Sequence, residues 1–173
     1  TYLSLLWSAL AASLSDSDHA RFTERAGKLA PDDRSWRARM TRAQTLSHRE
    51  WVLADARRAA LRFAWHRFFE QWDVLLLPVM PTTAFAHDHR PFGQRTLAVD
   101  GIERPYFDCL FWAGLAGVAY LPSTVIPAGA GADGLPVGVQ IVGPAYGDLR
   151  TIQLAQRLES LGFAFRPPPG FDG

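Results

Sequence analysis

The segment from Leu121 to Val142 constrains this chain most, because two short apolar runs lie on either side of a glycine-rich turn. Residues 137–142 form the clearest strand pattern, and residues 121–127 resemble a strand whose prolines leave it few ladder hydrogen bonds. The turn at residues 130–134 predicts that the two strands pair antiparallel. Because a strand pair needs a larger sheet around it, and few other strands are predicted, we expect chain outside these residues to complete the main sheet.

Residues 47–72 contain neither glycine nor proline, and they predict one long amphipathic helix. Ser47 and Glu50 have the capping-box spacing, in which each side chain accepts a hydrogen bond from the other residue's backbone N–H. The arginines mostly lie off the apolar side and predict a solvated face, with a partner-binding face as the alternative. The apolar side comprises Leu53, Ala56, Ala60, Ala64, Phe68 and Trp72.

Asp73 is expected to end this helix, and the apolar run at residues 74–77 predicts a strand that is buried on both faces. Residues 78–83 predict a stiff extended loop, since a proline disfavours the helical conformation of the residue before it. In α/β sheets, ligands bind where loops leave the carboxyl ends of buried strands. This loop is therefore a candidate ligand-binding segment.

The N-terminal residues predict short helices. Residues 2–14 carry apolar side chains at helical spacing, and Asp18 is expected to cap a second helix that runs through Leu29. Residues 31–33 mark a loop, and residues 36–42 are basic with few apolar side chains.

The Asp100-Gly101 pair predicts a tight turn between strands at residues 96–99 and 102–104, because these two residues tolerate positive φ. Residues 106–119 predict a buried helix, whose glycines allow close packing or end it.

Asp148 is expected to cap a last helix, and an extended tail that includes Pro167-Pro168-Pro169 follows from Arg166. The order of elements, with helices, a strand, a hairpin, a helix, a strand pair and a helix, predicts a mixed α/β fold. The last helix is expected to present Leu149, Ile152, Ala155 and Leu158 on one face.

Composition narrows the class of protein. A hydrophobic fraction of 48%, a charged fraction of 20% and a net charge of +1 are typical of a globular domain, and they give no electrostatic reason to expect nucleic acid or a membrane as partner. Cys109 is the single cysteine, so an internal disulfide is impossible and a buried, inert thiol is expected. These features fit a reducing compartment, and we expect a cytoplasmic location.

A search for a self-sufficient active site finds none. The sequence has no Gly-x-Ser-x-Gly elbow, no P-loop and no Gly-x-Gly-x-x-Gly after a strand. Lys28 is the only lysine, and it lies in a helix that is expected to be exposed. Ser123 and Thr124 have no base near them in sequence, so we expect them to hydrogen-bond to backbone. We therefore expect no catalytic residue in this chain.

His87 and His89 form the one metal-like pair, because alternate residues of an extended chain face the same side. No third ligand is recognisable near them, so a surface loop is the preferred interpretation and a metal site is the alternative. We predict no metal and no cofactor.

Residues 72–81, together with residues 121–129 and 133–144, resemble the C-terminal portion of the amidase signature family. The resemblance spans about residues 45–165, and residues 1–44 match only weakly. We therefore divide the chain into a helical segment, residues 1–44, and the C-terminal part of an amidase domain, residues 45–173. The resemblance implies a mixed β-sheet flanked by helices.

The resemblance also implies the hydrolysis of a carboxamide to an acid and an amine or ammonia. The family uses a serine nucleophile, a second bridging serine and a lysine base, all in its N-terminal half. This chain has no glycine- and serine-rich run and no lysine on a strand. The resemblance therefore assigns it the roles of scaffold and substrate-pocket wall, and the isolated chain is predicted to be inactive.

The expected partners are a small-molecule amide, the missing N-terminal part of the same protein and, in a homo-oligomer, further copies of the chain. The chain begins without Met, which we interpret as a sign that it was cut from something longer. The alternative function is a non-catalytic, amidase-like binding module. By resemblance, the pocket wall comprises Thr82, Phe85, Tyr106, Phe107 and Asp108.

Overall fold

The computed structural model describes residues 1–167 and 170–171, and the chain divides into two compact units, Thr1–Phe63 and Ala64–Gly173. The prolines at 168 and 169 of the expected tail lie outside the described residues. The division at residue 44, which was drawn from resemblance, stays a prediction. In the described part of the chain, no helix combines the length and apolarity that crossing a bilayer requires.

The first unit is helical and contains α1 (Tyr2–Ala11), α2 (Asp16–Gly27), α3 (Trp36–Gln44) and the start of α4 (His48–Phe69). Helices α1 and α3 pack together, with Trp7 and Trp36 edge to face at 6.0 Å between ring centroids. Ser15 caps α2, since its Oγ accepts a hydrogen bond from the Asp18 N–H at 3.1 Å. The prediction that Asp18 caps this helix was wrong, because the serine hydroxyl precedes the first turn and takes that place.

The capping box of α4 is confirmed. The Ser47 N–H donates to Glu50 Oε2 at 2.8 Å, and the Glu50 N–H donates to Ser47 Oγ at 3.3 Å. The glycine-free and proline-free sequence gives a helix of 22 residues, yet Ala54 is its only buried residue. On the expected apolar side, Leu53 is 45% exposed, so this face is not covered by other described residues.

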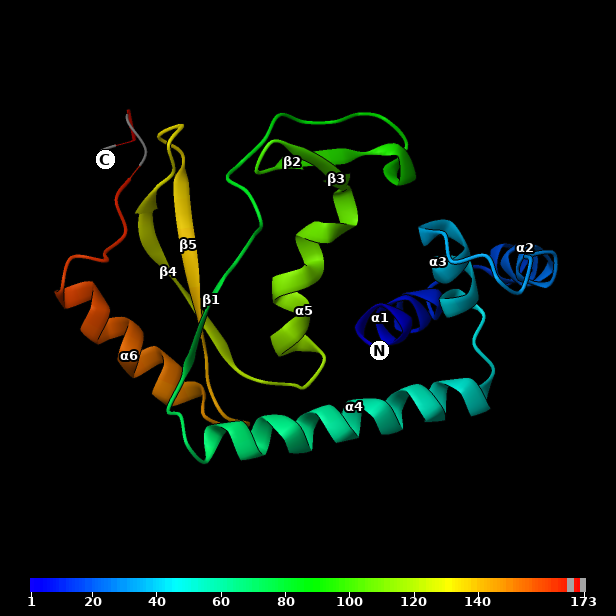
Figure 1. The fold of residues 1–173 in the computed structure, drawn as a ribbon, viewed down its shortest axis with the longest axis horizontal. Helices are drawn as coiled ribbons and strands as arrows, with labels where there is room; N and C mark the ends of the chain where they lie inside the picture. The colour runs from blue at the N-terminus through cyan, green and yellow to red at the C-terminus, as the bar shows by residue number, and fades with distance from the viewer. Residues whose placement is uncertain (168–169, 172–173) are drawn as a thin grey trace. The chain divides into compact units, whose positions relative to one another are not determined.

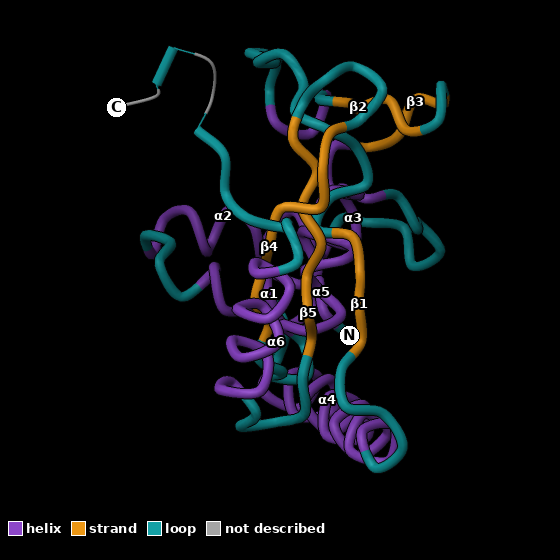
Figure 2. Tube along the Cα trace, turned by 90° about the vertical axis from the view of Figure 1, so that its left-hand side faces the viewer, coloured by secondary structure: helices purple, strands orange, loops and turns teal. Residues whose placement is uncertain are grey.

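The second unit contains a three-stranded antiparallel sheet with the order β1-β5-β4 (Figure 2). Its strands are β1 (Leu75–Pro78), β4 (Ser123–Ala130) and β5 (Pro136–Val142). The predicted antiparallel pairing of β4 with β5 is confirmed. The prediction that β1 is buried on both faces was wrong: β1 pairs only with β5, and Leu76 is 53% exposed.

Helix α6 (Asp148–Ser160) covers one face of this sheet, and α5 (Phe111–Gly117) lies on the other side (Figure 1). Thr151 is the buried residue of α6, and Thr151 Oγ1 lies 2.8 Å from Thr124 Oγ1 on β4. Two expectations for this helix were wrong. Gly147 is the N-cap instead of Asp148, and Leu149 and Ile152 are 73% and 44% exposed, because the hydroxyl-bearing side of the helix faces the sheet.

The predicted hairpin is confirmed as β2 (Thr96–Val99) paired with β3 (Ile102–Pro105). Asp100 and Gly101 at its turn have φ values of 52° and 74°, as a primed turn requires. The helix expected at residues 106–119 divides in two, with the 3₁₀ helix η2 (Tyr106–Leu110) leading into α5. A further 3₁₀ turn, η1 (Phe92–Gln94), precedes the hairpin.

Candidate functional site

The loop at residues 79–85, which leaves β1, is attached to the turn between β4 and β5. Thr83 Oγ1 donates a hydrogen bond to Asp133 Oδ2 at 2.6 Å, and the other carboxylate oxygen accepts the Leu135 N–H at 3.1 Å. These bonds, that of Thr83 first, hold the pKa of Asp133 below its usual value, because they favour the ionised carboxylate. The loop therefore has a fixed attachment at its far end.

An aromatic cluster receives the end of this loop. Phe85 meets Tyr106 edge to face, with 6.0 Å between ring centroids, and Phe92 lies 5.3 Å from Tyr106. The Arg95 guanidinium stands over the Phe92 and Tyr106 rings at 5.2 and 6.0 Å from their centroids. Two residues expected in the pocket wall, Phe85 and Tyr106, are thus brought together from separate segments.

The other expected wall residues have different surroundings. Phe107 is buried, with its ring 4.5 Å from that of Phe92, so it belongs to the core of the unit. Asp108 accepts a hydrogen bond from Arg104 Nε at 3.0 Å, which ties η2 to the β2–β3 hairpin. Thr82 is half-buried and precedes the anchored Thr83.

Gln140 was not singled out by sequence reasoning, although it is the one polar side chain in an apolar strand. It is 4% exposed, and its amide nitrogen donates to the carbonyl of Pro78 at 2.7 Å. Its amide oxygen accepts from Ser123 Oγ at 3.0 Å, so one side chain links all three strands. A lone amide in a buried strand is the signal that would have found it, since a buried amide requires partners.

The hydroxyls of Ser123 and Thr124 bond to side chains, which corrects the expectation that they bond to backbone. Their partners are Gln140 and Thr151, and neither partner is a base that could activate a nucleophile. Lys28 forms an exposed ion pair with Glu24, as expected of a surface lysine. Burial raises the pKa of the Cys109 thiol, which disfavours the reactive thiolate.

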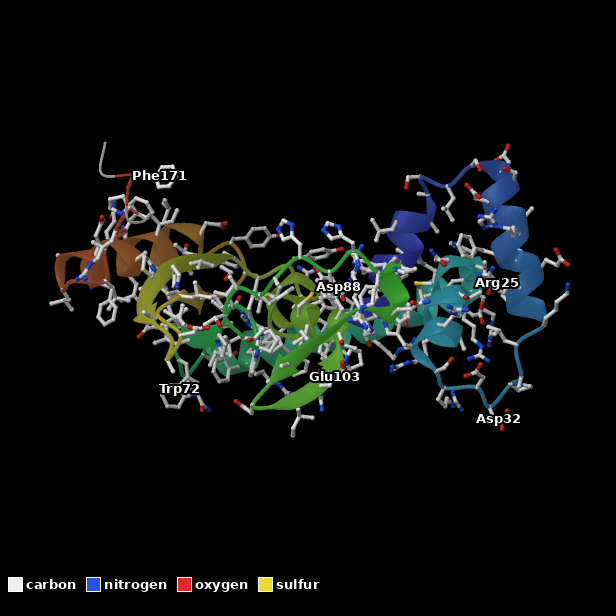
Figure 3. All side chains as sticks on the ribbon, turned by 90° about the horizontal axis from the view of Figure 1, so that it is seen from above. Arg25, Asp32, Trp72, Asp88, Glu103 and Phe171 are labelled. Carbon is white, nitrogen blue, oxygen red and sulfur yellow. The ribbon has the colours of Figure 1, made fainter. Side chains whose placement is uncertain are left out.

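His87 and His89 lie near each other, with 6.2 Å between ring centroids. Asp88 between them is held by Arg90, whose hydrogen bonds lower the pKa of this carboxylate to about 2 (Figure 3). Across the described ranges, no group of three or more His, Cys, Asp or Glu residues is placed to hold a metal ion. The pair therefore has no third protein ligand in this part of the chain.

Known proteins resemble most of the chain. The amidase family model matches residues 3–152, so the match also includes the N-terminal segment that was expected to match weakly. One of the glutamyl-tRNA(Gln) amidotransferase subunits of Halothermothrix orenii is 29% identical over 109 residues, which cover 63% of this chain and 21% of that protein. The indoleacetamide hydrolase of Bradyrhizobium japonicum is 28% identical over 136 residues, which cover 76% of this chain and 28% of that protein.

A crystal structure of an amidase aligns with a TM-score of 0.58 and 25% identity, over 83% of this chain and 31% of that one. The chain thus spans about a fifth to a third of the length of the relatives it matches. The family match covers well over half of the chain, and the mixed α/β arrangement corresponds to a portion of these enzymes. The chain therefore belongs to the amidase signature family.

Proposed function

We propose that the chain acts as the C-terminal part of an amidase, which hydrolyses a carboxamide to an acid and an amine or ammonia. The serine nucleophile, bridging serine and lysine base would then come from polypeptide outside this chain. Two observations support this division of labour. The hydroxyls on β4 are engaged by non-basic side chains, and the single lysine is exposed in an ion pair.

The observation that carries the proposal is an unfinished sheet. Its three strands leave two open edges, on β1 and β4, within the described residues. Leu76 on β1 and Val125 on β4 are 53% and 54% exposed. Open edges with apolar side chains are an aggregation hazard that proteins normally cover or charge. A further portion of an amidase domain would cover both.

The contribution of this chain to the reaction would be a wall of the substrate pocket. Phe85 and Tyr106 form an edge-to-face pair at the end of the anchored loop, and Thr82 adds a half-buried hydroxyl. Aromatic pairs of this kind pack well against flat or apolar groups, so the wall suits an apolar acyl or aryl substituent of the amide. Phe107 and Asp108 would support the wall from behind and from the β2–β3 hairpin.

A complementation assay tests the proposal. The isolated chain should hydrolyse neither aryl nor aliphatic amides above background. Mixing it with the N-terminal portion of a related amidase, truncated before the matched region, should restore hydrolysis. The matched control is the same N-terminal portion with its nucleophilic serine replaced by alanine, which should remain inactive.

Two outcomes would contradict the proposal. Hydrolysis by the isolated chain that is lost on Ser123→Ala or Lys28→Ala would mean that its own residues catalyse the reaction. A mixture that stays inactive, while the isolated chain still binds an amide, would instead favour the non-catalytic binding module.

A further inference from the structure

The segment from Pro78 to Phe85 runs along the β4–β5 hairpin and touches it at three places. At the first, the buried Gln140 amide donates to the Pro78 carbonyl at 2.7 Å. Pro78 has no N–H to offer β5, so this side-chain bond secures the end of β1, where the ladder is weak. The same amide accepts from Ser123 on β4, which fixes its orientation.

The second contact is at Gly138. A Cβ built at this glycine would lie 3.3 Å from Val79 Cγ2 and 3.2 Å from Val125 Cγ1. The missing side chain therefore lets Val79 lie against the surface of β5, beside the neighbouring strand. A larger residue at position 138 would displace the first residue of the loop.

The third contact is at the turn. Thr83 donates to Asp133 at 2.6 Å, and the Leu135 N–H holds the other oxygen of that carboxylate. Gly131 makes room for this arrangement, because a Cβ there would lie only 2.8 Å from Thr83 Cγ2. The turn thus presents a preformed acceptor in a place where only glycine leaves room for Thr83.

We propose that Gln140 and Asp133 are positioning residues, which hold the Pro78–Phe85 segment in one course along the β4–β5 hairpin and so set where Thr82 and Phe85 stand. The functional meaning rests on the proposed amidase role, in which Thr82 and Phe85 face the substrate. Gln140 fixes the start of the segment and Asp133 its far end, while Tyr106 receives Phe85 beyond the second attachment.

Hydrogen–deuterium exchange on the whole chain tests this attachment. Thr83→Val removes the hydroxyl at nearly constant volume, and Asp133→Ala removes its acceptor. Each should speed exchange of the amides of residues 79–86 by about three- to tenfold, as loss of a hydrogen bond to a charged group allows. The double variant should exchange no faster than either single variant, because both remove the same bond.

Thr83→Ser is the conservative control, and it should keep exchange of residues 79–86 close to the wild-type rate. Asp88→Ala, which breaks a carboxylate contact outside this segment, should leave that exchange unchanged. Wild-type exchange in Thr83→Val, or additive effects in the double variant, would overturn the proposal.

The same variants separate this inference from the proposed function. Exchange in the isolated chain reports the attachment whether or not the chain serves an amidase. In the complemented enzyme, the factor by which Thr83→Val raises KM should be about threefold or more larger than the factor by which it lowers kcat, and Thr83→Ser should restore KM. A loss of kcat alone would overturn the positioning of the wall, whereas a failure to complement would count against the amidase role only.

Discussion

Strands β1 and β5 are neighbours with similar apolar sequences, yet they differ sharply in burial. Leu76 and Ile141 face each other in the register of the two strands, and they are 53% and 0% exposed. The difference lies in their surroundings, since β5 has a strand on each side and β1 has one. A run of apolar residues therefore indicates a strand, while the number of neighbours determines what that strand buries.

The largest expected effect is at the centre of the sheet. Ile141→Ala should lower the free energy of unfolding by about 3 kcal/mol, because it removes a fully buried side chain and leaves a cavity. Leu76→Ala on the same face is the matched control and should cost about 1 kcal/mol or less, since half of that side chain is already in water. Urea unfolding of the two variants measures the contrast, and equal losses would contradict it.

Gly143→Ala should be the next in size, because it disturbs the contact between α6 and the sheet. The new Cβ would lie 2.7 Å from Cγ2 of Thr151, which is fully buried and has little freedom to move. Overpacking of this kind costs about 1–3 kcal/mol. Leu149→Ala, on the exposed side of the same helix, should change stability by about 0.5 kcal/mol or less in the same urea titration.

Thr151→Val should cost about 1–2 kcal/mol, because it leaves the half-buried Thr124 hydroxyl without its partner at 2.8 Å. The double variant Thr124→Val with Thr151→Val should recover part of this loss, since no polar group is then left unpaired there. A double-mutant cycle on unfolding free energies measures the recovery, and strictly additive losses would show that the two hydroxyls are not coupled.

Local patterns in the sequence predicted the features that depend on neighbouring residues. The Ser47–Glu50 capping box, the Asp100-Gly101 turn and the β4–β5 pair all depend on a few adjacent residues, and all three are confirmed. The errors concern contacts between distant segments. Nothing near Thr151 in sequence indicates that its hydroxyl, instead of Leu149 or Ile152, would face the sheet.

The candidate site follows the same division. Its loop was predicted from the prolines after β1, and Phe85 does meet Tyr106. The bonds that fix the loop join residues far apart in sequence, such as Thr83 with Asp133 and Pro78 with Gln140. Such partners depend on the register of β1 against β5, which one sequence does not reveal.

The smallest effect on stability, and the sharpest test of the open edge, is expected from Leu76→Lys. A lysine on an edge strand keeps its charge in water, so the free energy of unfolding of the isolated chain should change by about 1 kcal/mol or less. The same change should reduce self-association of the isolated chain in analytical ultracentrifugation, because a charge at an open edge discourages strand pairing. It should also weaken complementation by the N-terminal portion, since a covered edge would have to bury that charge.

Val52→Lys, at a 45% exposed position on α4 in the other unit, is the comparison variant for the general effect of an added charge. It should leave self-association through the β1 edge unchanged, because it lies outside the sheet. If Leu76→Lys left both self-association and complementation at wild-type levels, the β1 edge would be a free surface, and the contrast with β5 would reflect a complete sheet.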